Sequence, residues 1–218
     1  MSIEIDTPTL ITGKSGRHFT YVFRGLTAGL IVSILVSAVI WFMSAAIPAK
    51  TGGPSTILQS FCQWLYDSQI GTGIRESIWV FPIIEGIHLL GIALSVGALC
   101  WFDFRLVGVA LRDTPVSVVW KQVMPVALSG FVLMIVSGSF LFWAEAATAY
   151  HSVHFWIKLT LLFLAGVNAW VFEFKTHAGI AAWDTAAVPP LPARIAGFLS
   201  LVLWTGIIIT GRTMAYNF

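Results

Sequence analysis

The sequence has few charged residues and few cysteines. Only 10% of its 218 residues are Asp, Glu, Lys or Arg, and the formal net charge is +2, whereas a soluble domain carries about 25% charged residues. Charge this sparse argues against an ordinary soluble domain, a disordered chain and a nucleic-acid binder, which needs clustered basic residues. The two cysteines, Cys62 and Cys100, make neither a disulfide framework nor a metal motif, and we expect two free thiols.

Motifs for common enzyme chemistry are missing as well. The sequence has no glycine-rich phosphate loop, no serine or cysteine nucleophile with its base, and no paired carboxylates, so it gives no support to a hydrolase or a nucleotide-driven machine. It is rich instead in apolar residues, at 57%, and has ten tryptophans and a mean hydropathy of +0.86. These values predict a bundle of membrane-spanning helices.

Five apolar stretches are long enough to cross about 30 Å of hydrocarbon. They cover residues 26–47, 78–102, 126–144, 153–172 and 195–216, and tryptophans flank several of them, as an aromatic belt would. Pro125 suits the first turn of the third span, and a Pro-rich segment at 189–192 precedes the fifth. We therefore predict an all-α integral membrane bundle of five transmembrane helices, preceded by an N-terminal tail over residues 1–25.

The distribution of Lys and Arg predicts the orientation of the bundle. One side holds eight of them, and the other holds four: Lys14, Arg17, Arg24, Arg105, Arg112, Lys121, Lys175 and Arg194 against Lys50, Arg75, Lys158 and Arg212. The side richer in positive charge faces the cytoplasm, so we expect a cytoplasmic N-terminus and a C-terminus on the outer side of the membrane. The first apolar run is too long for the core of a signal peptide and is interpreted as a retained anchor.

A further helix is predicted between the first two spans, over residues 55–70. Ser55 is placed to cap it, and apolar residues recur at helical spacing: Ile57, Leu58, Phe61, Trp64 and Leu65. We expect this amphipathic helix to lie on the outer surface of the membrane and to be broken by Gly71 and Gly73.

Ionisable side chains inside the predicted spans are candidates for function, because charge in the hydrocarbon is costly. Glu85 and His88 lie one helical turn apart, and Lys158 and Arg212 lie at a depth similar to that of Glu85. Two interpretations stay open. The first is a structural ion network in which the cations snorkel to the headgroups, and the second is an anion site that holds the carboxylates of a cofactor or substrate.

His88 is the candidate ligand for haem b. Gly91 and Ser95 follow it on the same helix face, and such a strip either receives a neighbouring helix closely or leaves room for a flat ligand. A histidine near the midplane of a helical bundle suits haem iron, with a structural, hydrogen-bonded histidine as the alternative. Met134 has a matching depth and is the candidate second ligand, although packing is the commoner role of such a methionine, and a five-coordinate haem is also allowed.

Two more polar features complete the candidates. His151 and His154, three residues apart at the outer mouth of the fourth span, have a spacing that suits a transition metal but lack an identified third ligand; polar interfacial histidines are the alternative. Asn168 is expected to make an interhelical hydrogen bond.

Several of these residues resemble the pattern of an uncharacterised family of small bacterial polytopic membrane proteins, which implies a bacterial inner membrane with the C-terminus in the periplasm. The resemblance starts with residues 74–85 and 88–91 and continues through Asp103, Phe104, Arg105, Leu106, Lys158, Asn168, Trp183, Asp184, Gly211, Arg212, Ala215 and Tyr216. More distantly, the layout is similar to membrane haem-b bundles of the protoporphyrinogen oxidase and copper-resistance D types. That resemblance implies roles for His88 and Lys158, but Asn168 and Glu173 stand where those bundles carry a further histidine.

These observations favour one function and leave two alternatives. The favoured one is a b-type-cytochrome-like membrane subunit that passes electrons between a periplasmic donor and the quinone pool, with Lys158 and Arg212 near the haem propionates. The first alternative is a cofactor-free accessory or assembly subunit of a membrane complex. The second is a small-ion transporter that uses Glu85, Lys158 and Arg212 as its site, although the sequence lacks the matched broken helices of such carriers.

Overall fold

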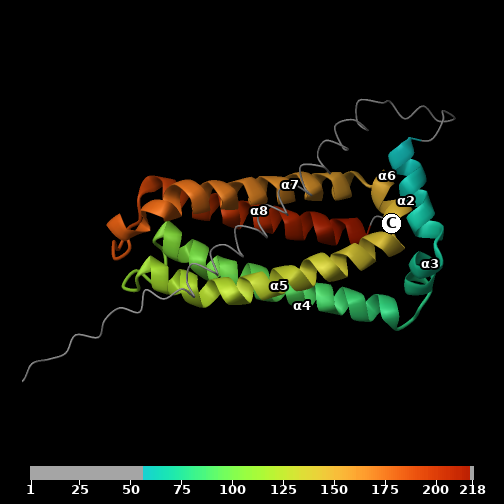
Figure 1. The fold of residues 1–218 in the computed structure, drawn as a ribbon, viewed down its shortest axis with the longest axis horizontal. Coiled ribbons are helices and arrows are strands. Elements are labelled where there is room, and N and C mark those ends of the chain that lie inside the picture. The colour runs from blue at the N-terminus through green and yellow to red at the C-terminus, as the bar shows by residue number, and fades with distance from the viewer. Residues whose placement is uncertain (1–55, 217–218) are drawn as a thin grey trace, which may run out of the picture.

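The computed structural model describes residues 56–216, and of residues 215 and 216 it describes the backbone alone. Four long helices lie side by side (Figure 1): α4 (Val80–Val107), α5 (Val116–Ala144), α7 (Val153–Val171) and α8 (Leu191–Tyr216). They alternate in direction, and the main packing pairs are α4 with α5, α7 with α8, and α4 with α8. No strand occurs among the described residues.

All four long helices are apolar and long enough to cross a membrane. The candidate spans are Val80–Val107, Val116–Ala144, Val153–Ala182 and Leu191–Met214. The third runs on from α7 through a π-helical turn, η1 (Phe172–Thr176), and a 3-10 helix, η2 (His177–Ala182). The predicted all-helical membrane bundle is confirmed for these four spans, while the predicted first span, residues 26–47, and the tail over residues 1–25 lie outside the described residues.

Three helices begin or end beyond their predicted limits. The helix α4 continues to Val107 rather than to residue 102, so Asp103 and Arg105 belong to it. The prediction that Pro125 opens the third span is wrong, because α5 begins at Val116 and Pro125 lies inside the helix. Proline there has no N–H for a helical hydrogen bond, but the rest of a long apolar helix compensates for one missing bond. The helix α8 begins at Leu191, with proline tolerated in its first turn.

Short helices gather at one end of the bundle, which we call the capped end (Figure 1): α2 (Ile57–Asp67), α3 (Gln69–Arg75) and α6 (Ala146–His151). The predicted single helix over 55–70 is two helices, because Ser68 ends α2 and its hydroxyl caps α3 by accepting from the Gly71 N–H. Gly71 does not break the helix; a Cβ there would lie 2.5 Å from the Leu65 carbonyl oxygen, so the tight corner requires glycine. Thr56 caps α2 by accepting from the Gln59 N–H.

Buried contacts hold the capped end to the long helices. Cys62, Leu65 and Ala146 form a small apolar core, and both cysteines are free, as predicted. The Arg75 guanidinium donates to the carbonyl oxygens of Tyr66, at 3.1 Å, and Ala144, at 2.8 Å. These bonds join three helices through one side chain.

The opposite end, the loop end, contains the α4–α5 and α7–α8 connections. The fully buried Arg105 donates to the carbonyl oxygens of Thr114, at 2.8 Å, and Ala186, at 2.9 Å, and so ties the two connections together. Asp184 accepts from both the backbone N–H and the hydroxyl of Ser117, each at 2.7 Å. The first turn of α5 is thereby held by the other connection.

The helices α4 and α5 pack with their backbones in close approach. A Cβ at Gly91 would lie 2.9 Å from the Gly130 carbonyl oxygen, and one at Gly130 would lie 2.5 Å from the backbone nitrogen of Ser95. The strip of Gly91 and Ser95 therefore receives a neighbouring helix, the first of the two roles that its sequence allowed.

Candidate functional site

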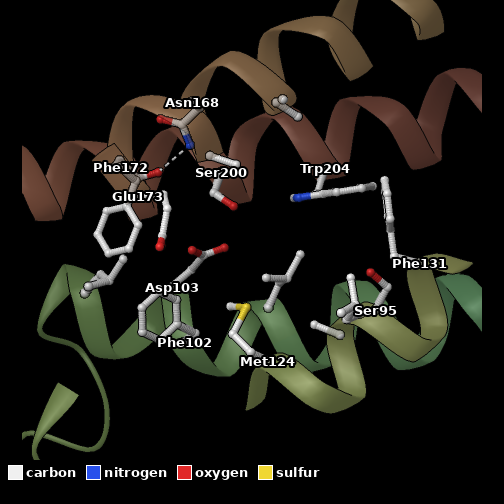
Figure 2. Close-up of a pocket in the computed structure, with 18 of the residues that line it drawn as sticks. Ser95, Phe102, Asp103, Met124, Phe131, Asn168, Phe172, Glu173, Ser200 and Trp204 are labelled. Atoms are coloured by element: carbon white, nitrogen blue, oxygen red, sulfur yellow. Dashed lines mark hydrogen bonds between the residues drawn. The ribbon is translucent and has the colours of Figure 1, made fainter. Parts of the chain in front are cut away.

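A cavity of about 150 Å³ lies inside the bundle and is lined by residues of all four long helices together with η1. Most of the lining is apolar. The polar exceptions are Ser95 and Asp103 on α4, Asn168 on α7, Glu173 on η1, and Ser200 and Trp204 on α8. Figure 2 shows the carboxyl groups of Asp103 and Glu173 and the hydroxyl of Ser200 directed toward the same part of the cavity. Sequence analysis did not predict this site.

Asp103 reaches the cavity because of helical periodicity. Ser95, Leu99, Phe102, Asp103 and Leu106 recur at spacings of three and four residues and line one face of α4. The side chain of Asp103 is buried, with 4% exposure, and the Ser200 hydroxyl is directed toward the same part of the cavity as its carboxyl group. A carboxyl group buried in an apolar setting with no cation beside it is costly to keep charged.

Glu173 lies on the π-helical turn that follows α7. It has 5% exposure, and its Oε2 is 3.2 Å from Nδ1 of His177. The imidazole of His177 stacks on Trp120, with ring centroids 4.8 Å apart, and on Phe172, at 5.9 Å. π-helical turns are frequent at functional sites, and this one places a buried acid next to a histidine.

Three other polar side chains in the cavity lining have donor or acceptor atoms available for a ligand. The Asn168 amide donates to the Ala196 carbonyl oxygen at 2.9 Å, which confirms the predicted interhelical hydrogen bond and leaves the side-chain oxygen as an acceptor. The Ser95 hydroxyl is buried without a partner among the described residues. In Figure 2 the indole nitrogen of Trp204 is directed toward the cavity. A buried polar group without a partner is uncommon and needs an explanation.

The cavity is chemically suited to a small cation with an apolar body. Its lining contains two carboxyl groups and, among the described residues, no Lys or Arg. Aromatic faces from Phe102, Phe131 and Trp204 line it as well, and such faces attract cations. A cavity of about 150 Å³ lined by apolar residues is large enough for a molecule the size of benzene.

His88, the predicted haem ligand, lies outside this cavity, between α4 and α5. Its Nδ1 is 3.0 Å from the Ser137 hydroxyl, and its Cε1 lies 3.0 Å from where a Cβ of Gly138 would be. The Ser137 hydroxyl donates to the Leu133 carbonyl oxygen, so it accepts from His88. The neutral ring then carries its proton on Nδ1 and leaves Nε2 as an acceptor.

The other predicted site residues, Glu85, Lys158 and Arg212, lie on three different helices toward the capped end. Lys158 lies close enough to act electrostatically on His88, and its Nζ is 3.6 Å from where a Cβ of Gly211 would be. It has no hydrogen bond or ion pair to any of the residues that the structure describes. Glu85 is half-buried and Arg212 is exposed, and the anion site of Glu85, Lys158 and Arg212 stays a prediction.

The remaining metal-ligand candidates are Met134, the predicted second haem ligand, and the separate pair His151 and His154. The Met134 side chain packs with Val96, Leu203 and Trp204 in the core. His151 is exposed and His154 half-buried, and no group of three or more His, Cys, Asp or Glu residues with metal-binding geometry occurs within residues 56–214. The two histidines therefore gain no third ligand from the described part of the chain.

These observations define the class of protein: a multi-pass helical membrane protein with a polar, acidic site buried among its spans. The chain belongs to a family of unknown function (DUF6644), whose model matches residues 61–217. The match covers more than half of the chain and includes every residue of the cavity. No curated protein and no solved structure matches the chain, so the function is argued from the site itself.

Proposed function

We propose that this protein binds a small organic cation inside the membrane, in the cavity lined by Asp103 and Glu173. The observation that carries the proposal is a pair of buried carboxyl groups in a mostly apolar cavity that has no Lys or Arg in its described lining. An ionisable residue inside a membrane bundle marks a functional site by default. An ammonium group supplies the positive charge that this lining lacks, together with hydrogen-bond donors for its carboxyl groups.

Asp103 is the residue proposed to bind the cation. Its carboxyl group lies near the Ser200 hydroxyl in the cavity, while Glu173 is already engaged by His177. The apolar body of the ligand would contact Phe102, Phe131 and Met124. Hydrogen bonds to charged groups contribute about 1.5–3 kcal/mol, so loss of the Asp103 charge should weaken binding by roughly tenfold or more.

Benzylamine is the probe that tests this proposal, with benzyl alcohol as its neutral counterpart of similar shape. At ten times its dissociation constant a ligand stabilises the folded state by about 1.4 kcal/mol, which raises the melting temperature of a chain of this size by roughly 3–5 °C. We expect that rise with benzylamine and a much smaller one with benzyl alcohol. Asp103→Asn keeps the shape of the side chain and should abolish the difference.

Asp113→Asn is the matched control, because Asp113 is exposed on the α4–α5 connection. It should respond to benzylamine as the wild type does. Equal responses to the amine and the alcohol, or an Asp103→Asn variant that still prefers the amine, would remove the basis of the proposal.

The second candidate function is electron transfer through haem b at His88, between a periplasmic donor and the quinone pool. The observation that favours it is the fixed tautomer of His88: Nδ1 donates to Ser137 and Nε2 stays available, which is the arrangement of a histidine that ligates metal. Against it, the Met134 side chain packs in the core, and the adjacent small-residue strip is filled by α5. Lys158 would hold a haem propionate.

A visible absorption spectrum, oxidised and then reduced with dithionite, separates the two candidates. Sharp haem bands that vanish in His88→Ala would establish the cytochrome. A featureless spectrum from folded protein supplied with haem would eliminate it. A cofactor-free accessory subunit would show neither haem bands nor a preference for the amine.

The number of membrane spans and their orientation are also part of our proposal. We propose five spans in a bacterial inner membrane, with residues 26–47 as the first, the N-terminus in the cytoplasm and the capped end on the periplasmic side. The excess of Lys and Arg on the side of the loop end, eight against four, supports this orientation. The loop end and His177 would then face the cytoplasm.

A further inference from the structure

A single histidine connects the acidic cavity with the surface near the loop end. Glu173 is buried and lines the cavity, and its Oε2 is 3.2 Å from Nδ1 of His177. The side chain of His177 is 19% exposed. The imidazole therefore contacts a buried carboxyl group and also reaches the surface.

The surroundings of His177 hold the ring in place without competing for its proton. Trp120 and Phe172 stack against its faces, and neither ring accepts a proton. An imidazole can take a proton on one nitrogen and release it from the other near neutral pH. A structural hydrogen bond to Glu173 could be made equally well by an Asn or Gln side chain. The imidazole adds the ability to carry a proton, so the arrangement favours that role for His177.

Few other charged or titratable side chains lie near Glu173 and His177. From α4, Asp103 lines the same cavity and Cys100 lies close to it, while Arg105 is bonded to Thr114 and Ala186 in the connections. Asp184 at the loop end is half-buried and accepts from Ser117, while Lys121 on α5, Lys175 on η1 and Arg194 on α8 are exposed. Within the described residues, Glu173 and His177 are thus the titratable groups between Asp103 and the surface.

We infer that Glu173 and His177 form a proton route into the cavity, and that a cation binding at Asp103 is exchanged for one proton that leaves by this route. The inference rests on the proposed function. In the empty site Asp103 holds a proton, because a buried carboxylate without a cation is costly. When an ammonium ion enters, the proton on the Asp103 carboxyl moves to Glu173, then to His177 and to water, and the carboxylate pairs with the ammonium ion. One positive charge enters and one leaves, so the membrane interior gains no net charge.

Infrared spectroscopy of the purified full chain in detergent tests both halves of the inference. The carbonyl stretching band of protonated carboxyl groups is recorded with and without benzylamine, and is assigned to residues with Asp103→Asn and Glu173→Gln. We expect benzylamine to reduce the Asp103 band. After transfer of the ligand-free protein to D₂O, exchange of the Asp103 carboxyl proton for deuterium shifts this band. We expect the shift to be at least tenfold slower in His177→Phe than in the wild type. Phenylalanine keeps an aromatic ring between Trp120 and Phe172.

Two further variants make the result specific. His177→Gln can still donate a hydrogen bond to Glu173, but an amide does not take up and release a proton near neutral pH. Its exchange in D₂O should therefore be as slow as that of His177→Phe. Lys175→Gln removes an exposed charge two residues away and should exchange like the wild type. The melting temperature of each variant is measured on the same sample, so a misfolded variant is recognised and the other is used.

The outcomes separate this inference from the proposed function. If benzylamine stabilises the wild type but both His177 variants exchange at the wild-type rate, the route is wrong while cation binding stands. If the amine binds and the Asp103 band does not change, or if the empty protein has no protonated Asp103, the exchange is wrong. If benzylamine neither binds nor changes the band, both proposals fail.

Discussion

Replacing Gly130 with alanine should separate the helices α4 and α5 at their closest approach. The added Cβ would lie 2.5 Å from the backbone nitrogen of Ser95 and 2.7 Å from the carbonyl oxygen of Gly91. Both neighbours are backbone atoms, which cannot rotate away as a side chain can. One helix must shift, and overpacking of this kind costs about 1–3 kcal/mol.

The matched control is Gly97→Ala on α4, where an added Cβ has nothing within 4 Å. Both substitutions replace a helical glycine with alanine, which by itself stabilises a helix by about 0.8–1.0 kcal/mol. The difference between the two variants therefore isolates the steric cost. For a chain of this size, about 1–3 kcal/mol corresponds to a melting temperature roughly 2–12 °C lower for Gly130→Ala than for Gly97→Ala.

The assay is thermal unfolding in mild detergent, followed by tryptophan fluorescence. Equal melting temperatures for the two alanine variants would show that α4 and α5 do not touch at Gly130, and the assignment of the small-residue strip to helix packing would fall with it. A stabilised Gly130→Ala would refute the packing still more directly.

Three further predictions concern other contacts. Arg105→Lys should lower the melting temperature by several degrees, because a lysine cannot donate to both connections as the planar guanidinium does, and limited proteolysis should then cut the loop end faster. Asn168→Leu should destabilise the α7–α8 pair by about 1 kcal/mol through loss of the bond to Ala196, measured as a lower melting temperature; an unchanged value would mean that this bond contributes nothing. Burial raises the pKa of the Cys62 thiol, so thiolate is scarce near pH 7.5 and alkylation of Cys62 in the folded protein should be slow. Mass spectrometry should show faster alkylation at higher pH and rapid alkylation in unfolded protein. Rapid alkylation of the folded protein at pH 7.5 would contradict the burial of Cys62.

The sequence was sufficient to predict the bundle because a membrane-spanning helix is determined by local composition. Twenty or so apolar residues must form a helix to satisfy their backbone in lipid, so the second to fifth predicted spans each correspond to a helix. The ends were less predictable. Charged residues such as Asp103 and Arg105 mark where an apolar run stops but not where the helix stops, and buried partners carry α4 beyond its apolar segment.

The same effect hid the candidate site. Asp103 and Glu173 stand at or beyond the ends of the predicted spans, where a charged residue is ordinary, so neither attracted attention as an intramembrane acid. Glu85 and Lys158 did, because they interrupt apolar runs. One signal was present in the sequence: Ser95, Leu99, Asp103 and Leu106 share a helical face, which a longer second helix would have revealed.

The cavity also has a consequence for how well this bundle can be optimised. A four-helix core with leucine at position 103 and a larger side chain at Ser95 would fill its space and remove two costly polar groups, and such a chain should be more stable than the natural one. The natural sequence forgoes that stability, and a bound cation would restore part of it. At these few residues, stability and the proposed binding of a cation therefore place opposite demands on the sequence. A search for stabilising substitutions in this protein would locate the proposed binding site without any knowledge of the ligand.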